Sequence, residues 1–322
     1  MSESGPAPIS PIEVPPAVSN ASHREVFGAL SHAQWLRVLI SSLRDPVVEA
    51  VSMPAFPPLR HQTDTHGTGG RSALEEAARF VAVVDQYAVR EGRPVGESTR
   101  VLDFGCGWGR MLRFFLNRVD SQNLYGIDVR DESVDMARQL NPFARFVRTE
   151  ALPPTSFADG FFDLIFAYSV FSHLSEAVSR AWIAELARVM KPGGLAIVTT
   201  QGNGFLDLVE SLSARAGLWR LWLAVGRWIG RPRNEEWLRT LRDGFGDIAA
   251  ARRRLADGQF VHAPTGGGSG LAASFYGESV IPRSYVAREW TDLELVEFID
   301  DPRRLPQAVI VLRKPLHGSQ TG

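Results

Sequence analysis

Short apolar runs alternate with amphipathic segments through the middle of the chain. The runs are of strand length, and the segments between them repeat apolar residues every three or four positions, as helices do. This order is typical of right-handed βαβ units, so it predicts a parallel sheet with helices on both faces. The predicted strands are 100–104, 123–128, 144–148, 162–168 and 195–200, and the predicted helices are 110–117, 132–140 and 175–190.

The N-terminal part has a different pattern. Residues 1–20 hold five prolines and little apolar material, which predicts a disordered leader. Ser-x-x-Glu capping boxes at 22–25 and 72–75 predict two helix starts. Between them, residues 52–71 are rich in Pro, Gly, Thr and His and are expected to form a loop. The second helix should present Leu74, Ala77, Ala78, Val81 and Val84 to the core and stop before Gly92.

The C-terminal part breaks the alternation after residue 202. Residues 203–270 have a helical pattern, and two strand candidates, 293–299 and 308–312, close the chain. The expected organisation is a leader (1–20), a helical N-terminal extension with a flap (21–95), a cofactor-binding core (96–202), a helical lid (203–270) and C-terminal strands that complete the sheet (271–322).

A glycine turn follows the first core strand, in the segment Val101-Leu102-Asp103-Phe104-Gly105-Cys106-Gly107-Trp108-Gly109-Arg110. Glycines tolerate strained backbone angles and let a ligand approach the main chain. The following helix would offer free N–H groups to an anionic group. A dinucleotide-binding turn reads G-x-G-x-x-G, whereas this one reads G-x-G-x-G with Asp103 two residues before the first glycine.

An acidic residue ends the next predicted strand. Asp128, in Gly126-Ile127-Asp128, lies 19 residues beyond Gly109. A carboxylate at this place accepts hydrogen bonds from a ribose diol in sheets of this topology. This order of strand, glycine turn, helix, strand and acid predicts a nucleoside-containing cofactor. The alternative is a glycine turn that binds no ligand, with an aspartate on the surface.

These segments resemble the motifs of class I S-adenosylmethionine-dependent methyltransferases. Residues 101–110 are similar to their motif I and residues 126–128 to their ribose-binding motif. Phe162-Asp163-Leu164-Ile165-Phe166-Ala167-Tyr168 resembles the fourth-strand motif, and Arg188-Val189-Met190-Lys191-Pro192-Gly193-Gly194 the stretch before the fifth strand. The turn, Ser169-Val170-Phe171-Ser172-His173-Leu174 and Val309-Ile310-Val311-Leu312 also resemble a bacterial subgroup of unassigned small-molecule or glycan methyltransferases.

The resemblance implies a three-layer α/β/α Rossmann-like sheet of seven strands, the last of them antiparallel. It implies S-adenosylmethionine as cofactor, with S-adenosylhomocysteine as product. Asp103 would orient the cofactor's amino group, Asp128 would hold the ribose and Val129 would lie against the adenine. The turn residues Gly105, Cys106, Gly107 and Gly109 would wrap the methionine part.

One departure concerns the acid that many relatives carry after the third strand, near the adenine amine. Here the run is Arg148-Thr149-Glu150-Ala151-Leu152-Pro153, which places Glu150 closer to the Leu-Pro pair than that acid usually lies. Glu150 is therefore a cofactor-binding candidate whose place differs from the family pattern.

Other side chains are candidates for chemistry at the carboxyl ends of the strands. His173 could take a proton from an acceptor hydroxyl, or pack against the following helix. Tyr168 could line the cofactor and methyl-transfer site, or lie at its rim. Arg110 could grip the cofactor carboxylate, or be an exposed arginine at a helix start. Residues 62–70 are expected to close on the cofactor as a flap.

Composition excludes several classes of function. The formal net charge of -1 gives no general attraction to nucleic acid. The single cysteine, Cys106, excludes an internal disulfide, and no spacing of ligand residues predicts a metal site. The N-terminus has no signal-peptide pattern and no apolar run reaches the length of a membrane span, so the expected location is cytoplasmic.

Arginines and tryptophans are interleaved between residues 210 and 235. Such a segment either lies in a membrane interface or covers an acceptor pocket as a lid, and we favour the lid.

The sequence therefore predicts methyl transfer from S-adenosylmethionine to a small-molecule acceptor, a hydroxyl of a sugar, glycan precursor or natural product. Two alternatives stay open: a non-catalytic cofactor-binding module, and a nicotinamide-dependent oxidoreductase, against which the glycine spacing counts. Oligomeric state is not predicted.

Overall fold

A computed structural model describes residues 17–211, 235–266 and 271–316. The chain forms two compact units, which we describe separately. Unit 1 comprises Met1–Ile165 and Arg188–Gly194, and unit 2 comprises Phe166–Ala187 and Leu195–Gly322. The Trp-rich part of the predicted lid, including Trp219, Trp222 and Trp228, lies outside the described residues.

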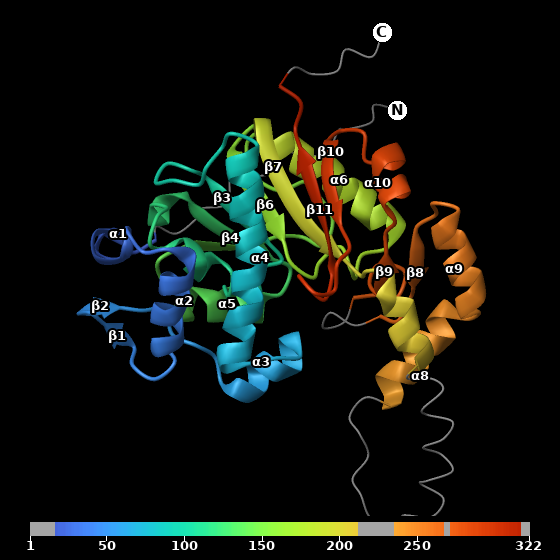
Figure 1. Cartoon of the computed structure of the whole chain (residues 1–322), viewed down its shortest axis with the longest axis horizontal. Coiled ribbons are helices and arrows are strands. Elements are labelled where there is room, and N and C mark those ends of the chain that lie inside the picture. Colours follow the sequence, from blue (N-terminus) through green and yellow to red (C-terminus); the bar gives the residue numbers. More distant parts are fainter. Residues whose placement is uncertain (1–16, 212–234, 267–270, 317–322) are drawn as a thin grey trace, which may run out of the picture. The chain divides into compact units, whose positions relative to one another are not determined.

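A seven-stranded sheet has the order β10-β11-β7-β6-β3-β4-β5 (Figure 1). β3, β4 and β5 pair in parallel, whereas β11 is antiparallel to both β7 and β10. The expected mixed sheet with an antiparallel last strand is therefore confirmed. The strands are β3 (Val101–Phe104), β4 (Leu124–Asp128), β5 (Arg145–Arg148), β6 (Phe162–Ala167), β7 (Met190–Thr200), β10 (Glu294–Ile299) and β11 (Ala308–Arg313).

Unit 1 has two long helices that match the predicted amphipathic pattern. All five apolar side chains predicted to face inward from the second helix are buried in α4 (Gly70–Arg90), and α5 (Asp131–Leu140) connects β4 with β5. In Figure 1, α2 (His32–Ser41) runs beside α4, with which it is in contact. Short pieces complete the unit: β1 (Val47–Val48), β2 (Val51–Ser52) and the 3-10 turn η2 (Ser121–Asn123).

The predicted start of the first helix is wrong. α1 (Ala21–Phe27) begins one residue before Ser22 and has no side-chain cap. The capping box lies at Ser31 and Gln34, where the Ser31 hydroxyl accepts from the Gln34 N–H and opens α2. The box predicted at 72–75 is also wrong, because α4 starts at Gly70 after an uncapped Gly69.

The segment predicted as a loop and flap contains a helix. Residues 53–58 lie outside helices and strands, as expected, but α3 (Leu59–His66) covers residues 62–66 of the predicted flap, although its composition is polar. Gln62 is buried; its amide donates to Pro57 O (2.8 Å) and accepts from the Gly70 N–H (2.8 Å). A buried glutamine that binds the backbone on both sides holds this segment against α4, so it is not the open loop expected from composition.

The helix predicted over 110–117 is also wrong. Only a 3-10 turn forms there, η1 (Leu112–Phe115), and all four of its residues are buried. The segment is buried on every side, and the tighter 3-10 turn takes the place of the predicted α-helix. The argument from an α-helix N-terminus therefore does not apply to the glycine turn.

The predicted leader has an ordered end. Val18 N–H donates to Pro142 O (2.8 Å). The Asn20 side chain is buried and donates to the carbonyls of Leu116 and Val119, both at 2.8 Å. Residues 17–20 thus belong to unit 1, while residues 1–16 lie outside the described part.

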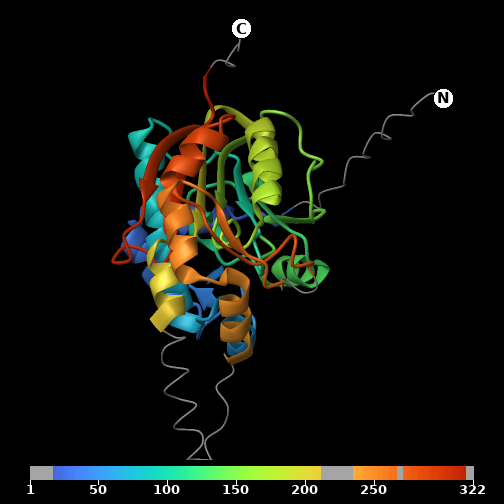
Figure 2. The same ribbon diagram turned by 90° about the vertical axis from the view of Figure 1, so that its right-hand side faces the viewer.

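Unit 2 contains the predicted C-terminal strands and a pair that was not predicted. β10 and β11 run side by side in both views (Figures 1 and 2). The unpredicted strands β8 (Val261–Ala263) and β9 (Glu278–Val280) pair antiparallel. Its helices include residues 204–211, α8 (Glu235–Phe245), α9 (Ile248–Ala256) and α10 (Arg283–Glu289). α6 (Glu176–Val189) joins the two units in sequence.

No helix in the described part of the chain is both long enough and apolar enough to cross a membrane.

Candidate functional site

The glycine turn of unit 1 adopts the conformation that its glycines permit. Gly105, Gly107 and Gly109 have φ angles of 77°, 53° and 78°, in the left-handed region that side chains disfavour. The N–H groups of Gly105 and Cys106 donate to Ile127 O at 2.8 and 3.0 Å. The end of β4 therefore anchors the start of the turn.

Packing also requires glycine here. A Cβ atom on Gly109 would lie 2.8 Å from the Phe146 ring, and one on Gly126 would lie 2.7 Å from it. Neither distance leaves room for a methyl group. These two glycines are explained by the close approach of β5, so the evidence for a ligand must come from the polar side chains.

Asp103 is the most informative of those side chains. It lies in β3, is 2% exposed, and its Oδ2 atom has no hydrogen-bond partner in the described part of the chain. Burial raises the pKa of this carboxyl well above its ordinary value; Arg110 opposes the shift and Asp128 adds to it. A buried, unsatisfied carboxylate is costly, and a cation placed against it would remove that cost.

Asp128 ends β4 and is held by two backbone N–H groups. Gly107 N–H donates to Oδ2 (2.9 Å), and Arg130 N–H donates to Oδ1 (3.0 Å). Each oxygen has two lone pairs, so each can accept one further hydrogen bond. The carboxylate is fixed in place and still able to accept from two neighbouring hydroxyls.

Arg110 is buried, so the alternative of an exposed arginine at a helix start is wrong. Only 4% of the residue is exposed. Its Nη1 donates to Ala73 O and Glu76 Oε1 of α4, both at 3.3 Å. Its charge lowers the pKa of Asp103, which places a fixed cation near that carboxyl.

The other cofactor candidates of unit 1 differ in their surroundings. Val129 follows β4 and is half-buried. Glu150 is well exposed, with 73% of its side chain accessible, and pairs with Arg148 at 2.7 Å. Cys106 is buried, and burial raises the pKa of its thiol well above the ordinary value, with Asp128 and Asp103 adding to the effect. The thiol is thus not a nucleophile at neutral pH.

A buried arginine beside the turn was not predicted. Arg113 is fully buried, and its guanidinium carbon lies 4.2 Å from the ring centroid of Phe56 and 4.8 Å from that of Trp108. Its Nη2 donates to Ala55 O (3.2 Å). Burial lowers the pKa of Arg113 to about 9. This stack attaches the segment before α3 to the glycine turn, and no sequence spacing indicates it.

The two catalytic candidates lie in unit 2. Tyr168 is the first residue after β6 and is half-buried. The His173 ring stacks on Tyr276, with centroids 4.9 Å apart and planes 8° from parallel. His173 Nδ1 lies 3.0 Å from Gly277 O and 3.5 Å from Glu278 Oε1, and Nε2 lies 3.4 Å from Ser169 Oγ.

A polar chain reaches His173 through residues that were not predicted as site residues. Ser169 has a φ of 61°, which is rare for a residue with a side chain. Its N–H donates to Thr199 Oγ1 (2.7 Å), Thr199 Oγ1 donates to Gln307 Oε1 (2.6 Å), and Gln307 Nε2 donates to Ser169 Oγ (3.0 Å). These bonds fix the strained serine next to the imidazole.

Comparison with known proteins identifies the segment that carries the glycine turn. Residues 101–194 match the model of a family described as "Methyltransferase domain". The chain is 34% identical over 128 residues to 2-methyl-6-phytyl-1,4-hydroquinone methyltransferase of Synechocystis, a match that covers 39% of this chain and 38% of that protein. It is 32% identical over 133 residues to a probable chloroplastic tocopherol O-methyltransferase of Oryza sativa, covering 39% of this chain and 34% of the relative. The chain thus matches little more than a third of the length of these relatives.

Solved structures match this chain at low sequence identity. A SAM-dependent methyltransferase from Methanosarcina mazei is 19% identical, with a TM-score of 0.42, over 69% of this chain and 95% of that one. Magnesium protoporphyrin IX methyltransferase from Synechocystis is 14% identical, with a TM-score of 0.44, over 76% of this chain and 86% of that one.

The family match covers β3 to the start of β7, which includes the glycine turn, Asp103, Arg110 and Asp128. Together with the order and directions of the strands, it identifies residues 101–194 as a methyltransferase domain of the class I, Rossmann-like type.

Proposed function

We propose that this chain transfers a methyl group from S-adenosylmethionine to a hydroxyl of a small molecule. The observation that carries the proposal is the buried Asp103 carboxylate at the glycine turn, whose Oδ2 has no hydrogen-bond partner in the described part of the chain. An ammonium group is the kind of partner that would satisfy it.

The residues around the turn fit the parts of this cofactor. Asp103 would bind the ammonium group, and Arg110 would interact with the carboxylate. Asp128, with one free acceptor position on each oxygen, would bind the two ribose hydroxyls. We also propose that Val129 lies against the adenine and that the turn at Gly105–Gly109 approaches the methionine part. Glu150 and Tyr168 complete the proposed binding residues.

When bound, S-adenosylmethionine supplies a methyl group on a sulfonium sulfur, which is an electrophile that needs no further activation. The chain has to position the acceptor, exclude water and remove a proton. His173 is the proposed general base, because an imidazole takes a proton from a hydroxyl near neutral pH. Tyr168 is the proposed second residue at the methyl-transfer position.

The acceptor is proposed as a hydroxyl on a natural product, a sugar or a glycan precursor. The two curated relatives are named for a phytyl hydroquinone and for tocopherol. Those names favour an aromatic natural product over a sugar as the first acceptor to try.

Calorimetric titration of the full chain with S-adenosylmethionine and S-adenosylhomocysteine tests the proposal. We expect saturable binding of both and none of a nicotinamide dinucleotide. Asp128→Asn should weaken binding about 10-fold or more, because an amide accepts through one atom only. The control is Asp135→Asn, an exposed carboxylate on α5 that pairs with Arg138.

Absence of binding to folded wild-type protein would overturn the proposal. Binding without methylation of any alcohol or phenol in a broad panel would favour the non-catalytic module. Nicotinamide binding would favour the oxidoreductase.

A further inference from the structure

The surroundings of His173 determine which of its ring nitrogens carries the proton. A backbone carbonyl accepts hydrogen bonds and cannot donate them. His173 Nδ1 lies 3.0 Å from Gly277 O, so Nδ1 must carry the hydrogen. In the neutral ring, Nε2 then has a free lone pair.

The other side of the ring is consistent with this assignment. Ser169 Oγ accepts from Gln307 Nε2, so its own hydrogen is available for His173 Nε2, 3.4 Å away. The amide of Gln307 is oriented in turn by the Thr199 hydroxyl, which donates to Gln307 Oε1. Ser172 Oγ lies at the same distance, 3.4 Å, from Ser169 Oγ, so the Ser169 hydrogen can turn to Ser172 and leave the Nε2 lone pair to the hydroxyl of an acceptor.

A buried carboxylate lies on the Nδ1 side. Glu278 Oε1 is 3.5 Å from Nδ1, beyond a good hydrogen bond but close enough to attract the ring once it is protonated, and the Glu278 side chain is 8% exposed. Its other oxygen, Oε2, accepts from Gln201 Nε2 (2.7 Å). The Gln201 amide thus holds Oε2, while Oε1 faces the imidazole.

The backbone explains why residues so far apart in sequence meet. The start of β9 and the residue before it bond to the segment that carries His173: Gly277 N–H donates to His173 O (2.8 Å), and Ser279 N–H donates to Ser172 O (2.7 Å). Two short backbone bonds on either side of Glu278 fix its position against the histidine. The contact therefore comes from strand pairing and does not depend on the flexibility of a long side chain.

Besides Glu278, the titratable side chains near His173 in the described part of the chain include His262 and Tyr276. His262 on β8 binds Ser279 Oγ through Nδ1 (2.7 Å). Burial lowers the pKa of His262, and the charge of His173 adds to that effect. His262 is therefore uncharged at neutral pH and does not neutralise Glu278. Tyr276 contributes its ring face to the stack.

We propose that Glu278 is a positioning residue that, together with the Gly277 carbonyl, favours the Nδ1–H form of His173 and that stabilises the imidazolium formed when Nε2 takes a proton from an acceptor hydroxyl. The proposal rests on the proposed methyl transfer to a hydroxyl. In that step the oxygen–hydrogen bond of the acceptor breaks, the proton moves to Nε2, and the oxygen keeps the electron pair. The negative charge of Glu278 offsets the new positive charge on the ring.

Nitrogen NMR of the full chain with labelled histidine tests this without any acceptor. The His173 signals are assigned by their loss in His173→Gln. We expect the wild-type neutral ring to carry its hydrogen on Nδ1. In Glu278→Gln the titration midpoint of His173 should fall by about one pH unit or more, because the compensating charge is lost while the shape is retained.

The matched control is Glu289→Gln, a carboxylate of unit 2 that pairs with Arg180 and Arg288. It should leave the His173 titration unchanged. Gln201→Leu keeps the Glu278 charge but removes the amide that orients it, so it should give a smaller fall. It serves as the test if Glu278→Gln does not fold.

Equal midpoints in wild type and Glu278→Gln would overturn the proposal, as would a neutral ring protonated on Nε2. Calorimetry of the same samples tests the proposed function separately from the proposed role of Glu278. Loss of Glu278 should leave S-adenosylmethionine binding unchanged, whereas a wild-type chain that binds none would refute the proposed function without altering the NMR result. Once an acceptor is known, Glu278→Gln should lower kcat about 10-fold or more with little change in KM.

Discussion

Asp103 is unfavourable for folding because its carboxyl is buried without a hydrogen-bond partner for Oδ2 in the described part of the chain. Its carboxyl is buried, and its pKa is raised well above 3.8. The folded protein therefore holds a proton on Asp103 that the unfolded chain releases, so the free energy of unfolding falls as the pH rises from the ordinary carboxyl pKa through the raised one. Below the ordinary carboxyl pKa, Asp103 is protonated in both the folded and the unfolded state, so burial of its charge no longer lowers the stability.

Asp103→Asn should remove this penalty. We expect the free energy of unfolding of the variant, without cofactor, to exceed that of wild type by about 1 to 3 kcal/mol at pH 7. Near pH 4 the two free energies of unfolding should be similar. Cofactor binding should weaken in the same variant. Urea denaturation at several pH values measures the first effect and calorimetry the second; a variant less stable than wild type at pH 7 would contradict the assignment.

At the residue scale, the sequence indicated which charged residues lie together near the glycine turn, but it did not indicate contacts between residues far apart in the chain. Asp103, Arg110 and Asp128 were expected within one motif region, and the structure brings their charges together. Glu278 was not predicted, because more than a hundred residues separate it from His173 and its short strand carries no ligand motif. Contacts between distant segments depend on strand pairing, which local patterns do not determine.

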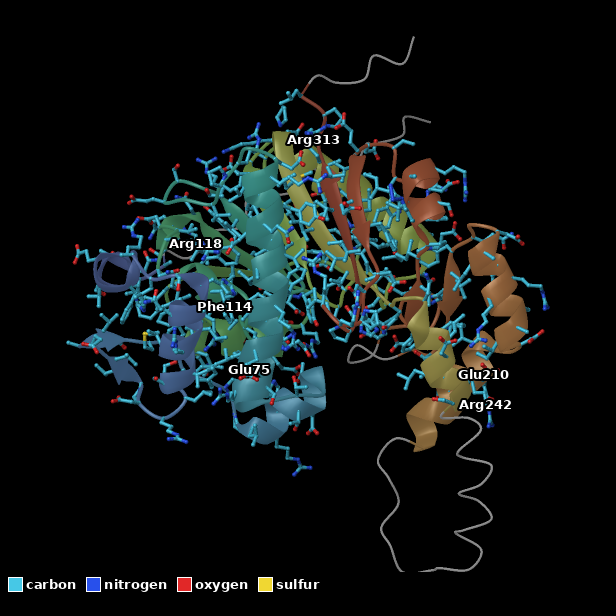
Figure 3. All side chains as sticks on the ribbon, in the orientation of Figure 1. Glu75, Phe114, Arg118, Glu210, Arg242 and Arg313 are labelled. Atoms are coloured by element: carbon cyan, nitrogen blue, oxygen red, sulfur yellow. The ribbon has the colours of Figure 1, made fainter. Side chains whose placement is uncertain are left out.

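At the scale of elements, α4 is the main support of the glycine-turn region in unit 1. Arg118, labelled in Figure 3, donates from Nη2 to both oxygens of Asp85 on α4, at 2.7 and 2.9 Å. Phe114, also labelled, stacks on His32 of α2, with ring centroids 6.1 Å apart. The segment after the turn is thus tied to two helices, although it forms only a 3-10 turn itself.

Asp85→Asn tests that support. Loss of a partly buried charged partner of Arg118 should lower the free energy of unfolding by about 1.5 to 3 kcal/mol. Glu97→Gln is the control, because Glu97 also pairs with an arginine, Arg24, but its side chain is 72% exposed. That change should cost less than about 1 kcal/mol. Equal losses in urea denaturation would contradict the structural role of α4.

Elements were predicted well where one periodicity dominates. The alternating strands and the stripe of α4 are examples, because a single buried face sets the pattern. Prediction failed where tertiary contacts override the local pattern: Gln62 holds a polar segment in a helix, and the buried chain at 112–115 forms a 3-10 turn in place of the predicted α-helix. It also missed β8 and β9, whose three residues each are too short to show a period.

At the scale of the whole molecule, the last strand of the chain is an inner strand of the sheet and not an edge strand. β11 lies between β7 and β10, and its residues Ala308 to Leu312 are buried. The unit boundaries fall within β6 after Ile165, within α6 after Ala187 and within β7 after Gly194, so each compact unit combines separate stretches of sequence. The consecutive blocks predicted along the chain could not reveal this, because sequence order does not give the order of strands in a sheet.

A charge in the middle of β11 should therefore prevent folding. Ile310 is 0% exposed, and Ile310→Lys would bury an unpaired ammonium group, at a cost that exceeds about 4 kcal/mol. We expect this variant to be insoluble on expression. Leu316→Lys is the control, because that side chain is 66% exposed and the change should be tolerated. Soluble, folded Ile310→Lys protein would contradict the position of β11.

Cys106 gives the molecule a built-in chemical probe. It is the chain's one thiol, it lies within the proposed binding turn, and both burial and two neighbouring carboxyls keep it protonated. An alkylating reagent can therefore modify it only when the turn opens, so the rate of modification measures the frequency of that local opening. Any molecule that holds the turn closed will reveal itself by slowing the reaction, with no label to attach and no other sulfhydryl to confuse the signal.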